Sequence, residues 1–229
     1  MPAPSFPADG VINAAAPAAA LSPGELFSIY GSNLAAGVQA PALLPLPATM
    51  AAATVQIDGI TAPLVYVSPL QINAQVPWEV TPGSATISVT HAGVTSSQAV
   101  SIAAAGPAIF TLYGSQQAAA LNQDYTVNSH ANPAPAKQAI LLFGTGFGAV
   151  SPSVSTGAAA GSDPPSQVIA NVTATVNGGA ANVLFVGLAP GFAGLWQINV
   201  ALPAGVSGAV PVILSVGGTA SNTVTIWIE

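Results

Sequence analysis

The chain has 229 residues and a formal net charge of −6, with one basic residue, Lys137, against seven acidic ones. A single base cannot neutralise a series of phosphates, which excludes nucleic acid and an anionic membrane surface as partners. Hydrophobic residues make up 51% of the sequence. No run of about 18 apolar residues lacks a proline, a glycine or a polar residue, so no membrane span is expected. The absence of cysteine excludes disulfide bonds and thiolate metal sites.

Short segments with alternating apolar and polar residues follow one another through the first half of the chain. Residues 1–9 are rich in proline and are expected to form a flexible tail. The later segments alternate with a period of two, which is typical of half-buried strands. Asp58-Gly59, between two of them, is a strong signal for a two-residue hairpin. Seven strands in about 95 residues match the spacing of immunoglobulin-like sandwiches. The expected strands are 10–14, 26–30, 54–57, 63–67, 71–76, 85–90 and 95–102.

The segment Leu70-Gln-Ile-Asn-Ala-Gln-Val-Pro77 returns later as Trp196-Gln-Ile-Asn-Val-Ala-Leu-Pro203. Apolar and polar residues alternate in both copies, and a proline ends each run where it can stop a strand without breaking a ladder. Four further matches occur in the same order. We therefore interpret the sequence as an internal duplication with an insertion at 187–194. The matched pairs are 13–17 with 128–133, 27–34 with 140–147, 57–59 with 175–178, and 96–102 with 220–226.

The duplication predicts an all-β fold of two tandem immunoglobulin-like β-sandwich domains. Each half has about 110 residues, which is long enough to enclose a hydrophobic core of its own. The expected division is a flexible N-terminal tail at 1–9, a first sandwich at 10–106, a linker at 107–117 and a second sandwich at 118–229.

The segments 27–35 and 140–149 resemble the strand–glycine opening of IPT/TIG-type immunoglobulin-like domains. Over residues 10–228 the chain resembles more closely a module called the Solibacter type, found at the C-termini of large secreted proteins of Acidobacteria. That resemblance implies an exported, extracellular or cell-surface β-sandwich module with no assigned catalytic residues. No export signal is visible, and we expect a mature or excised fragment. The residues that carry the resemblance are Gly10-Val-Ile-Asn-Ala-Ala15, Ser28-Ile-Tyr-Gly-Ser-Asn-Leu34, Tyr66-Val-Ser-Pro-Leu-Gln-Ile-Asn73, Val76-Pro-Trp-Glu79, Ala189-Pro-Gly191 and Ser221-Asn222.

No pattern in the sequence predicts a catalytic residue, a cofactor or a metal site. Gly144-Thr-Gly-Phe-Gly148 is rich in glycine, but no helix pattern follows it. We expect a strand end with close backbone packing there rather than a phosphate site. His91 in a hairpin turn and His130 in a loop are expected to be solvated, because no Gly-x-Ser-x-Gly elbow accompanies them. Asp124 and Asp163 lie in loops without the spacing of a calcium site.

The three tryptophans are candidates for an interface or for a surface that stacks against a ligand. Trp196 precedes a core strand and is expected to be buried or to cover the end of a sandwich. Trp227 is out of phase with the apolar residues of its strand and should face away from their side of the sheet. It can pack there against the neighbouring domain, another subunit or a ligand. Trp78 follows a proline and is expected at the surface, where tryptophan often anchors an interface.

Three classes of function remain open. The first is a non-catalytic extracellular or cell-surface structural or adhesion module, whose partners are other protein subunits or the rest of a larger secreted protein. The second is a carbohydrate-binding module that binds polysaccharide through exposed Trp, Gln and Asn side chains. The third is a hydrolase whose site is assembled only in three dimensions. The duplicated strands, the scarcity of charge and the lack of a catalytic motif favour the first.

The strand-like segment 10–16 has two expected ways of pairing. It can pair within its own domain, or it can add to the sheet of a neighbouring subunit and produce a dimer or a filament. Lysine is the usual guard of an exposed sheet edge, and this chain has a single one. There is also little like-charge repulsion to keep subunits apart.

Overall fold

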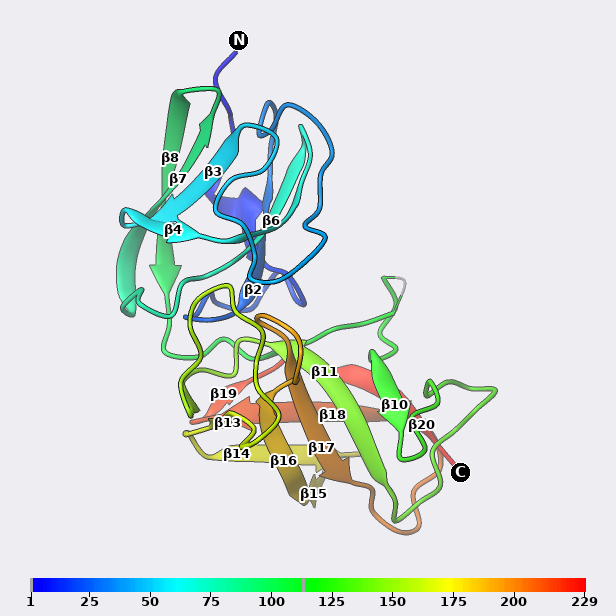
Figure 1. The fold of residues 1–229 in the computed structure, drawn as a ribbon. Helices are drawn as coiled ribbons and strands as arrows, with labels where there is room; N and C mark the ends of the chain where they lie inside the picture. Colours follow the sequence, from blue (N-terminus) through cyan, green and yellow to red (C-terminus); the bar gives the residue numbers. More distant parts are fainter. Residues whose placement is uncertain (1, 113) are drawn as a thin grey trace.

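The computed structural model describes residues 2–112 and 114–229, which form two β-sandwiches that follow one another along the chain (Figure 1). A short 3-10 helix, η1 (Ala8–Gly10), precedes the first sandwich, which encloses one core between two four-stranded antiparallel sheets. The first sheet runs in the order β1 (Val11–Asn13), β2 (Leu26–Tyr30), β6 (Gln71–Gln75) and β5 (Leu64–Val67). The second runs in the order β4 (Ile60–Ala62), β3 (Ala53–Ile57), β7 (Gly83–His91) and β8 (Val94–Ile102).

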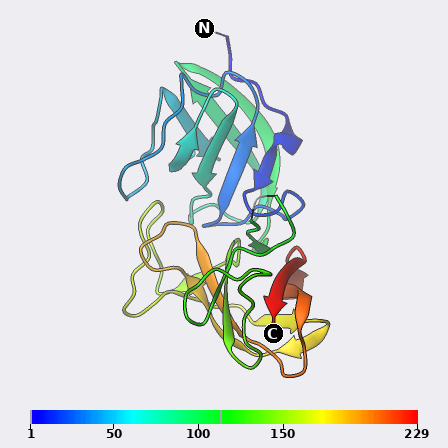
Figure 2. The same cartoon turned by 90° about the vertical axis from the view of Figure 1, so that its right-hand side faces the viewer.

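The second sandwich is built in the same way and has additional short strands. Its first sheet runs in the order β10 (Ala120–Asn122), β11 (Ala139–Thr145), β17 (Trp196–Ala201), β16 (Val183–Leu188), β13 (Gln167–Val168) and β12 (Val150–Ser151), with β9 (Ala108–Ile109) also paired to β11. Its second sheet runs in the order β15 (Gly179–Ala181), β14 (Val172–Val176), β18 (Gly208–Val216) and β19 (Thr219–Ala220), with β20 (Val224–Ile228) also paired to β18. The two sandwiches remain distinct when the molecule is turned (Figure 2).

The central strands of the two sandwiches pair in the same register. In the first sandwich β2 and β6 place Ser28 opposite Asn73. In the second, β11 and β17 place Leu141 opposite Asn199. Both asparagines belong to the repeated Gln-Ile-Asn segment, and both strands opposite them come from the matched segments 27–34 and 140–147. The expected all-β fold of two tandem immunoglobulin-like sandwiches is therefore confirmed.

The two predicted hairpin sequences, Asp58-Gly59 and Asn177-Gly178, form the same type of turn in both sandwiches. Asp58 and Gly59 have φ values of +48° and +80°, and Asn177 and Gly178 have φ values of +52° and +75°. A two-residue hairpin turn of this type needs a positive φ at both positions, which Asp-Gly and Asn-Gly tolerate. The turns join β3 to β4 and β14 to β15.

Each sandwich encloses a core of its own because alternate residues of its strands point inward. Ile72 in β6 and Ile198 in β17 are fully buried, in two separate apolar clusters. The first two polar residues of the repeated segment are only half-buried and pair with each other within each strand. The Gln71 amide donates to the Asn73 side chain at 2.8 Å, and the matched glutamine and asparagine of β17 form the same bond at 3.0 Å.

Residues 2–9 pack on the first sandwich, which differs from the flexible tail expected over 1–9. Phe6 is buried in the first core, and Ser5 and Ser32 exchange two backbone hydrogen bonds of 2.9 and 2.8 Å. The phenylalanine side chain gives this proline-rich segment apolar surface to bury. Met1 lies outside the described residues.

Residues of the expected linker 107–117 pair with the second sandwich. β9 extends the sheet of β11, and Gln117 forms a bridge to Thr225 in β20. Tyr113 lies outside the described residues.

The pairing at the start of the second sandwich shows that the sequence match of 13–17 with 128–133 was wrong. β1 pairs with β2 of its own domain, which is the first of the two expected modes for 10–16. Asn13 lies opposite Phe27 in this pair, and Asn122 lies opposite Ile140 in the pair of β10 and β11. Asn122 therefore takes the place of Asn13, and Asn128 belongs to the longer loop that follows.

Candidate functional site at the domain junction

The ends of the two sandwiches meet around the side chain of Glu25, which lies directly before β2. This carboxyl group is 0% exposed. Its Oε2 accepts hydrogen bonds from the Ser22 hydroxyl at 2.8 Å and from the Asn13 amide at 3.3 Å, whereas Oε1 has no hydrogen-bond partner among the described residues. The Asn13 amide also donates to the carbonyl of Gly106 at 3.1 Å. Glu25 is thus held by neutral donors, close to the segment that joins the sandwiches.

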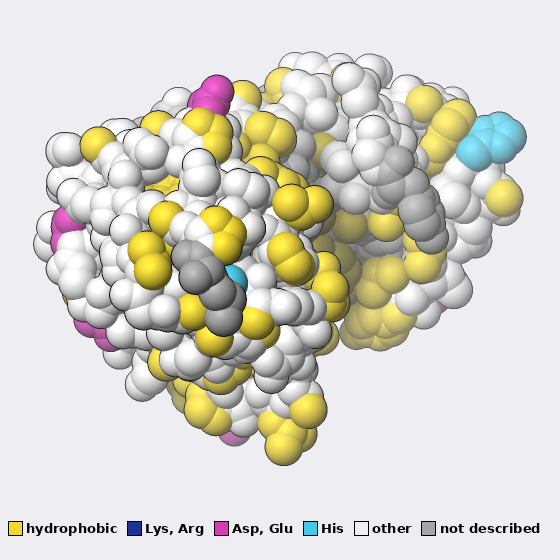
Figure 3. All heavy atoms as spheres, turned by 90° about the horizontal axis from the view of Figure 1, so that it is seen from above, with side chains coloured by type: hydrophobic (Ala, Val, Ile, Leu, Met, Phe, Trp, Pro, Cys, Tyr) yellow, Lys and Arg dark blue, Asp and Glu magenta, His cyan; other side chains and the backbone are white. Residues whose placement is uncertain are grey.

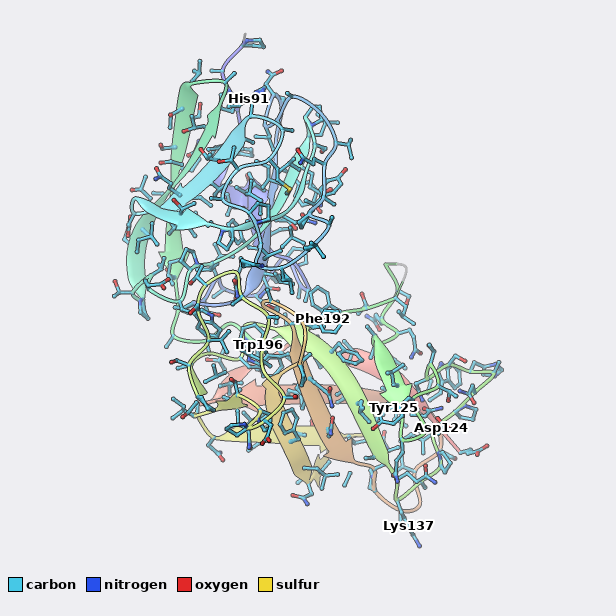
Figure 4. The ribbon with its side chains drawn as sticks, in the orientation of Figure 1. His91, Asp124, Tyr125, Lys137, Phe192 and Trp196 are labelled. Atoms are coloured by element: carbon cyan, nitrogen blue, oxygen red, sulfur yellow. The ribbon has the colours of Figure 1, made fainter. Side chains whose placement is uncertain are left out.

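Burial raises the pKa of Glu25 well above its ordinary value, because the charged form loses its hydration. The hydrogen bonds from Ser22 and Asn13 act in the opposite direction and offset part of this rise in pKa. The only base of the chain, Lys137, lies at the end of the second sandwich away from the first (Figure 4). The junction therefore favours the neutral acid at a pH where an exposed glutamate would be ionised.

The backbone of the second sandwich approaches this site through the glycine-rich stretch at the end of β11. The Gly106 N–H donates to the carbonyl of Gly146 at 2.9 Å, and the Leu26 N–H donates to Thr145 Oγ1 at 2.8 Å. Gly146 has a φ of +83°, and a Cβ atom at this position would overlap the carbonyl oxygen of Gly106. The close backbone packing expected for this strand end is confirmed.

Trp78 lies between the two sandwiches. Its backbone N–H donates to Thr156 Oγ1 at 3.0 Å, and its indole packs against Trp196 with the ring centroids 5.8 Å apart. Trp196 is fully buried in the second core, as expected, and the half-buried Trp78 packs against that core. The indole of Trp78 thus contacts the neighbouring domain of its own chain.

A loop of the second sandwich adds polar contacts on the same side. The Gly157 N–H donates to Gln75 Oε1 at 2.7 Å, and the Leu46 N–H donates to the Gly157 carbonyl at 2.8 Å. The Thr156 hydroxyl, which accepts from Trp78, donates to Glu79 Oε2 at 2.7 Å. The junction therefore combines a buried carboxyl group, close backbone contacts and an aromatic pair.

An apolar groove of about 410 Å³ runs along the junction. Phe192 lines it with 56% of its surface exposed, and Figure 4 shows this side chain at the level where the two sandwiches meet. The other lining residues are apolar and come from both sandwiches, among them Leu26, Leu44, Phe110 and Leu195.

Trp227, the second tryptophan expected at an interface or a ligand, lies away from the junction. It is half-buried on β20 on the opposite face from Val224, Ile226 and Ile228, which are buried. The exposed His130 side chain packs against it edge to face, with ring centroids 4.5 Å apart. The structure does not bring Trp78 and Trp227 together.

The expectation of a solvated histidine is wrong for His91. This residue ends β7 and is only 5% exposed, and its Nδ1 lies 2.7 Å from the carbonyl oxygen of Asn33. The turn itself is formed by Ala92 and Gly93, both with positive φ. His91 therefore shares the inward phase of Ile87 and Val89, a signal that was present in the sequence.

The other loop residues weighed as candidates, His130, Asp124 and Asp163, lie at the surface. His130 and Asp163 are exposed, and the exposed Asp124 accepts hydrogen bonds from the N–H and the hydroxyl of Thr126. These bonds lower the pKa of Asp124. Within residues 2–112 and 114–229, no group of three or more His, Asp or Glu side chains is placed to hold a metal ion.

The comparisons with known proteins give one family and a set of solved structures. The model of the IPT/TIG domain matches residues 11–103, which correspond to the first sandwich. No curated protein sequence matches the chain. No helix among the described residues is long and apolar enough to cross a membrane.

Several solved structures resemble the chain at low sequence identity. One is SGBP-B of the Bacteroides ovatus mixed-linkage glucan utilization locus, in complex with a mixed-linkage heptasaccharide, with 14% identity, a TM-score of 0.37, and coverage of 92% of this chain and 42% of that one. Domains 5–6 of the S-layer protein SbsC show 16% identity, a TM-score of 0.30 and 98% coverage of both chains. SGBP-B from a complex xyloglucan utilization locus in Bacteroides uniformis shows 12% identity, a TM-score of 0.28, and coverage of 99% of this chain and 49% of that one. The chain thus spans less than half the length of either SGBP-B.

Proposed function

We propose that the chain is a non-catalytic structural or adhesion module of the cell surface or extracellular space, in which the two sandwiches act as one rigid unit. The domain junction carries this proposal. Interfaces between domains of one chain usually permit relative motion unless they are large and apolar. Here the Gly146 backbone and the Trp78 indole join the two sandwiches, and the Glu25 carboxyl group is buried beside these contacts. Bending the junction would expose apolar surface and leave buried polar groups unpaired.

A fixed angle between two sandwiches suits a module that holds partners at a set distance and orientation. The partners in this proposal are other protein subunits or the rest of a larger secreted protein. The match of the IPT/TIG model to residues 11–103 supports a module of the immunoglobulin-like type. The resemblance to the Solibacter-type module stays a prediction.

The rigidity is tested by measuring nitrogen NMR relaxation of both sandwiches in the full chain. A rigid unit gives one rotational correlation time for both sandwiches, whereas a flexible pair gives two shorter ones. Trp78→Ala should separate the two values, and Trp227→Ala, which changes a tryptophan outside the junction, should not. Two independent correlation times in the native chain would contradict the proposal.

The remaining parts of the proposal have tests of their own. Esterase, protease and glycosidase screens of the native chain should give no turnover. Antibodies against the folded chain should label intact cells of the source organism. Reproducible turnover would favour the hydrolase hypothesis instead.

Polysaccharide binding is a second candidate function, and Trp227 is the observation that favours it. Its indole lies half-buried on an outer sheet face beside the exposed imidazole of His130, and aromatic side chains at such positions can pack against apolar faces of a ligand. A pull-down on insoluble polysaccharides tests this candidate. Binding that Trp227→Ala abolishes and Trp78→Ala retains would establish it, and no binding to any polysaccharide would remove it.

A further inference from the structure

The outer edge of β8 is a long strand edge without the features that usually block pairing. β8 is the last strand of the sheet β4-β3-β7-β8, and its nine residues pair with β7 in a regular register from Ile102 to Val94. It contains no charged residue, no proline and no bulge, which are the common guards of an exposed edge. Thr95, Ser97, Ala99 and Ser101 are exposed. Figure 1 shows β8 at the margin of the first sandwich.

The direction of the backbone groups of β8 follows from their neighbours. Ala99 lies opposite Thr86, whose N–H and carbonyl bond to Asp58 on the other side of β7. Because such groups alternate along an antiparallel pair, the N–H and carbonyl of Ala99 point away from β7. The Ala103 N–H points the same way and donates to the Leu21 carbonyl at 2.7 Å. Among the described residues, no backbone hydrogen bond reaches this side of β8 between Val94 and Ala99.

The second sandwich covers the corresponding edge with its own chain. Thr225 in β20 donates to the Gln116 carbonyl at 2.7 Å and accepts from the Ala118 N–H at 2.8 Å. Trp227 donates to Asn128 Oδ1 at 2.8 Å and accepts from the Ala134 N–H at 2.9 Å. These outward groups of β20 are thus paired, whereas those of β8 between Val94 and Ala99 have no backbone partner among residues 2–112 and 114–229.

The N-terminal segment does not close the edge of β8. The Ser96 hydroxyl donates to the Pro4 carbonyl at 2.6 Å, and the Gln98 amide donates to the Phe6 carbonyl at 2.9 Å. These contacts involve side chains on the inward phase of the strand. The backbone of Ser5, between the two acceptors, pairs with Ser32 at the end of β2.

We propose that β8 pairs with β8 of a second copy of this chain in an antiparallel, two-fold symmetric arrangement. An axis beside Ser97 places Ser97 opposite the same residue of the second copy and Ala99 opposite Thr95, so that the free N–H and carbonyl groups satisfy each other. The side chains that meet are small and uncharged, so no charge on the strand repels a second copy. Two four-stranded sheets become one continuous sheet across the dimer.

This inference rests on the proposed structural role and names its partner, a second copy of the same chain. A second copy is favoured as the partner because its β8 edge is identical. A two-fold axis then places an acceptor of the second copy's β8 opposite each free donor of the first copy's β8. Pairing through one edge strand buries little surface, so the dimer is expected to be weak and to dissociate on dilution.

The test is sedimentation velocity of the full chain up to about 1 mM, where a weak dimer is populated. Ala99→Pro removes one outward N–H from each copy and leaves the ladder with β7 intact, because proline is tolerated where the N–H faces solvent. It should weaken dimerisation at least about tenfold. Ala99→Val adds bulk but keeps the N–H, and it should dimerise like the native chain. Ser97→Lys places two like charges directly opposite each other across the axis and should also give a monomer.

Each outcome separates this inference from the proposed function. A native chain that stays monomeric at the highest concentration, or an Ala99→Pro variant that dimerises as well as the native chain, overturns the pairing of β8. If Ala99→Pro does not fold, the Ser97→Lys variant decides in the same way. NMR relaxation of a monomeric variant still tests the rigid junction, so the proposed function can hold when the dimer fails.

Discussion

The end of the first sandwich that enters the junction differs from the matching end of the second in two informative residues. Glu25 precedes β2, and the residue that precedes β11 in the matched segment is Gln138. Trp78 follows the proline after the first Gln-Ile-Asn strand, and Ala204 follows the proline after the second. Glu25 is buried and Trp78 half-buried, whereas Gln138 and Ala204 are exposed. Positions that the two copies share build the sandwich. The two positions at which the copies diverge, those of Glu25 and Trp78, show where the first sandwich meets the second.

The largest expected loss of stability comes from substituting the buried isoleucine that the two sandwiches share in the repeated Gln-Ile-Asn segment. Ile72→Asp and Ile198→Asp each place a carboxylate in a fully buried position, and an unpaired buried charge costs several kcal/mol or about the whole stability of a domain. Each variant should unfold its own sandwich, as measured by the loss of that domain's amide signals in NMR spectra. Native-like melting of either variant would show that its strand faces the other way.

The strand pattern was readable from sequence because a period of two leaves a trace in every half-buried strand. The hairpins at Asp58-Gly59 and Asn177-Gly178 were readable because few residue pairs tolerate positive φ at both positions. The role of Glu25 was not recognised. Apart from Ser22, three residues earlier, its surroundings come from residues more distant in sequence, such as Asn13 and Gly106, and no local pattern connects Glu25 to these.

One signal for the junction was nevertheless present in the sequence. Carboxylates are rare in this chain, and comparison of the two repeats isolates Glu25 and Trp78 as departures from the matched pattern. The surface expected for Trp78 was an interface with unknown partners, whereas the structure places the second sandwich there. A tryptophan beside a proline indicates an interface but not which surface meets it.

The next largest effect is expected at the glycine backbone of the junction. Gly146→Ala should destabilise the chain by about 2–4 kcal/mol, because the alanine adds strain at positive φ and its Cβ overlaps the Gly106 carbonyl oxygen. Gly191→Ala is the matched control: Gly191 has the same φ of +83°, but a Cβ there meets no atom within 4 Å. Denaturant unfolding measures both. Equal losses would mean that strain alone, and not the junction contact, accounts for the effect.

The effect of Glu25→Gln depends on pH. The pKa of Glu25 is raised in the folded state by burial, so the folded chain holds its proton more tightly than the unfolded chain. The stability contributed by Glu25 is therefore fully present below the pKa of the unfolded state and is lost as the pH rises through the raised pKa. Glu25→Gln should remove this loss and stabilise the chain at pH 8 by about 1–3 kcal/mol relative to the native chain.

The measurement for Glu25 is the unfolding free energy from acidic to mildly alkaline pH. The native chain should lose stability as the pH rises above the ordinary glutamate range, and the variant should show a flatter curve. Asp124, whose pKa is lowered, contributes the opposite slope at more acidic pH in both chains. Parallel curves for the two chains would show that Glu25 does not titrate differently on folding.

The smallest expected effect tests the polar rim of the junction. Thr156 Oγ1 accepts from the Trp78 N–H and donates to Glu79 Oε2, so Thr156→Val keeps the shape of the side chain and removes both bonds. The loss should be about 0.5–1.5 kcal/mol, because the partly buried Trp78 N–H is left unpaired whereas Glu79 is exposed and can bind water. Thr90→Val is the control, since Thr90 bonds Thr95 at 2.8 Å on an exposed sheet face far from any interdomain contact. Water can replace that bond, and valine suits a strand, so its effect on the unfolding free energy should be smaller. If Thr90→Val costs as much as Thr156→Val, the rim of the junction is no more sensitive than an ordinary sheet surface, and the rigidity must come from Glu25, Gly146 and Trp78 alone.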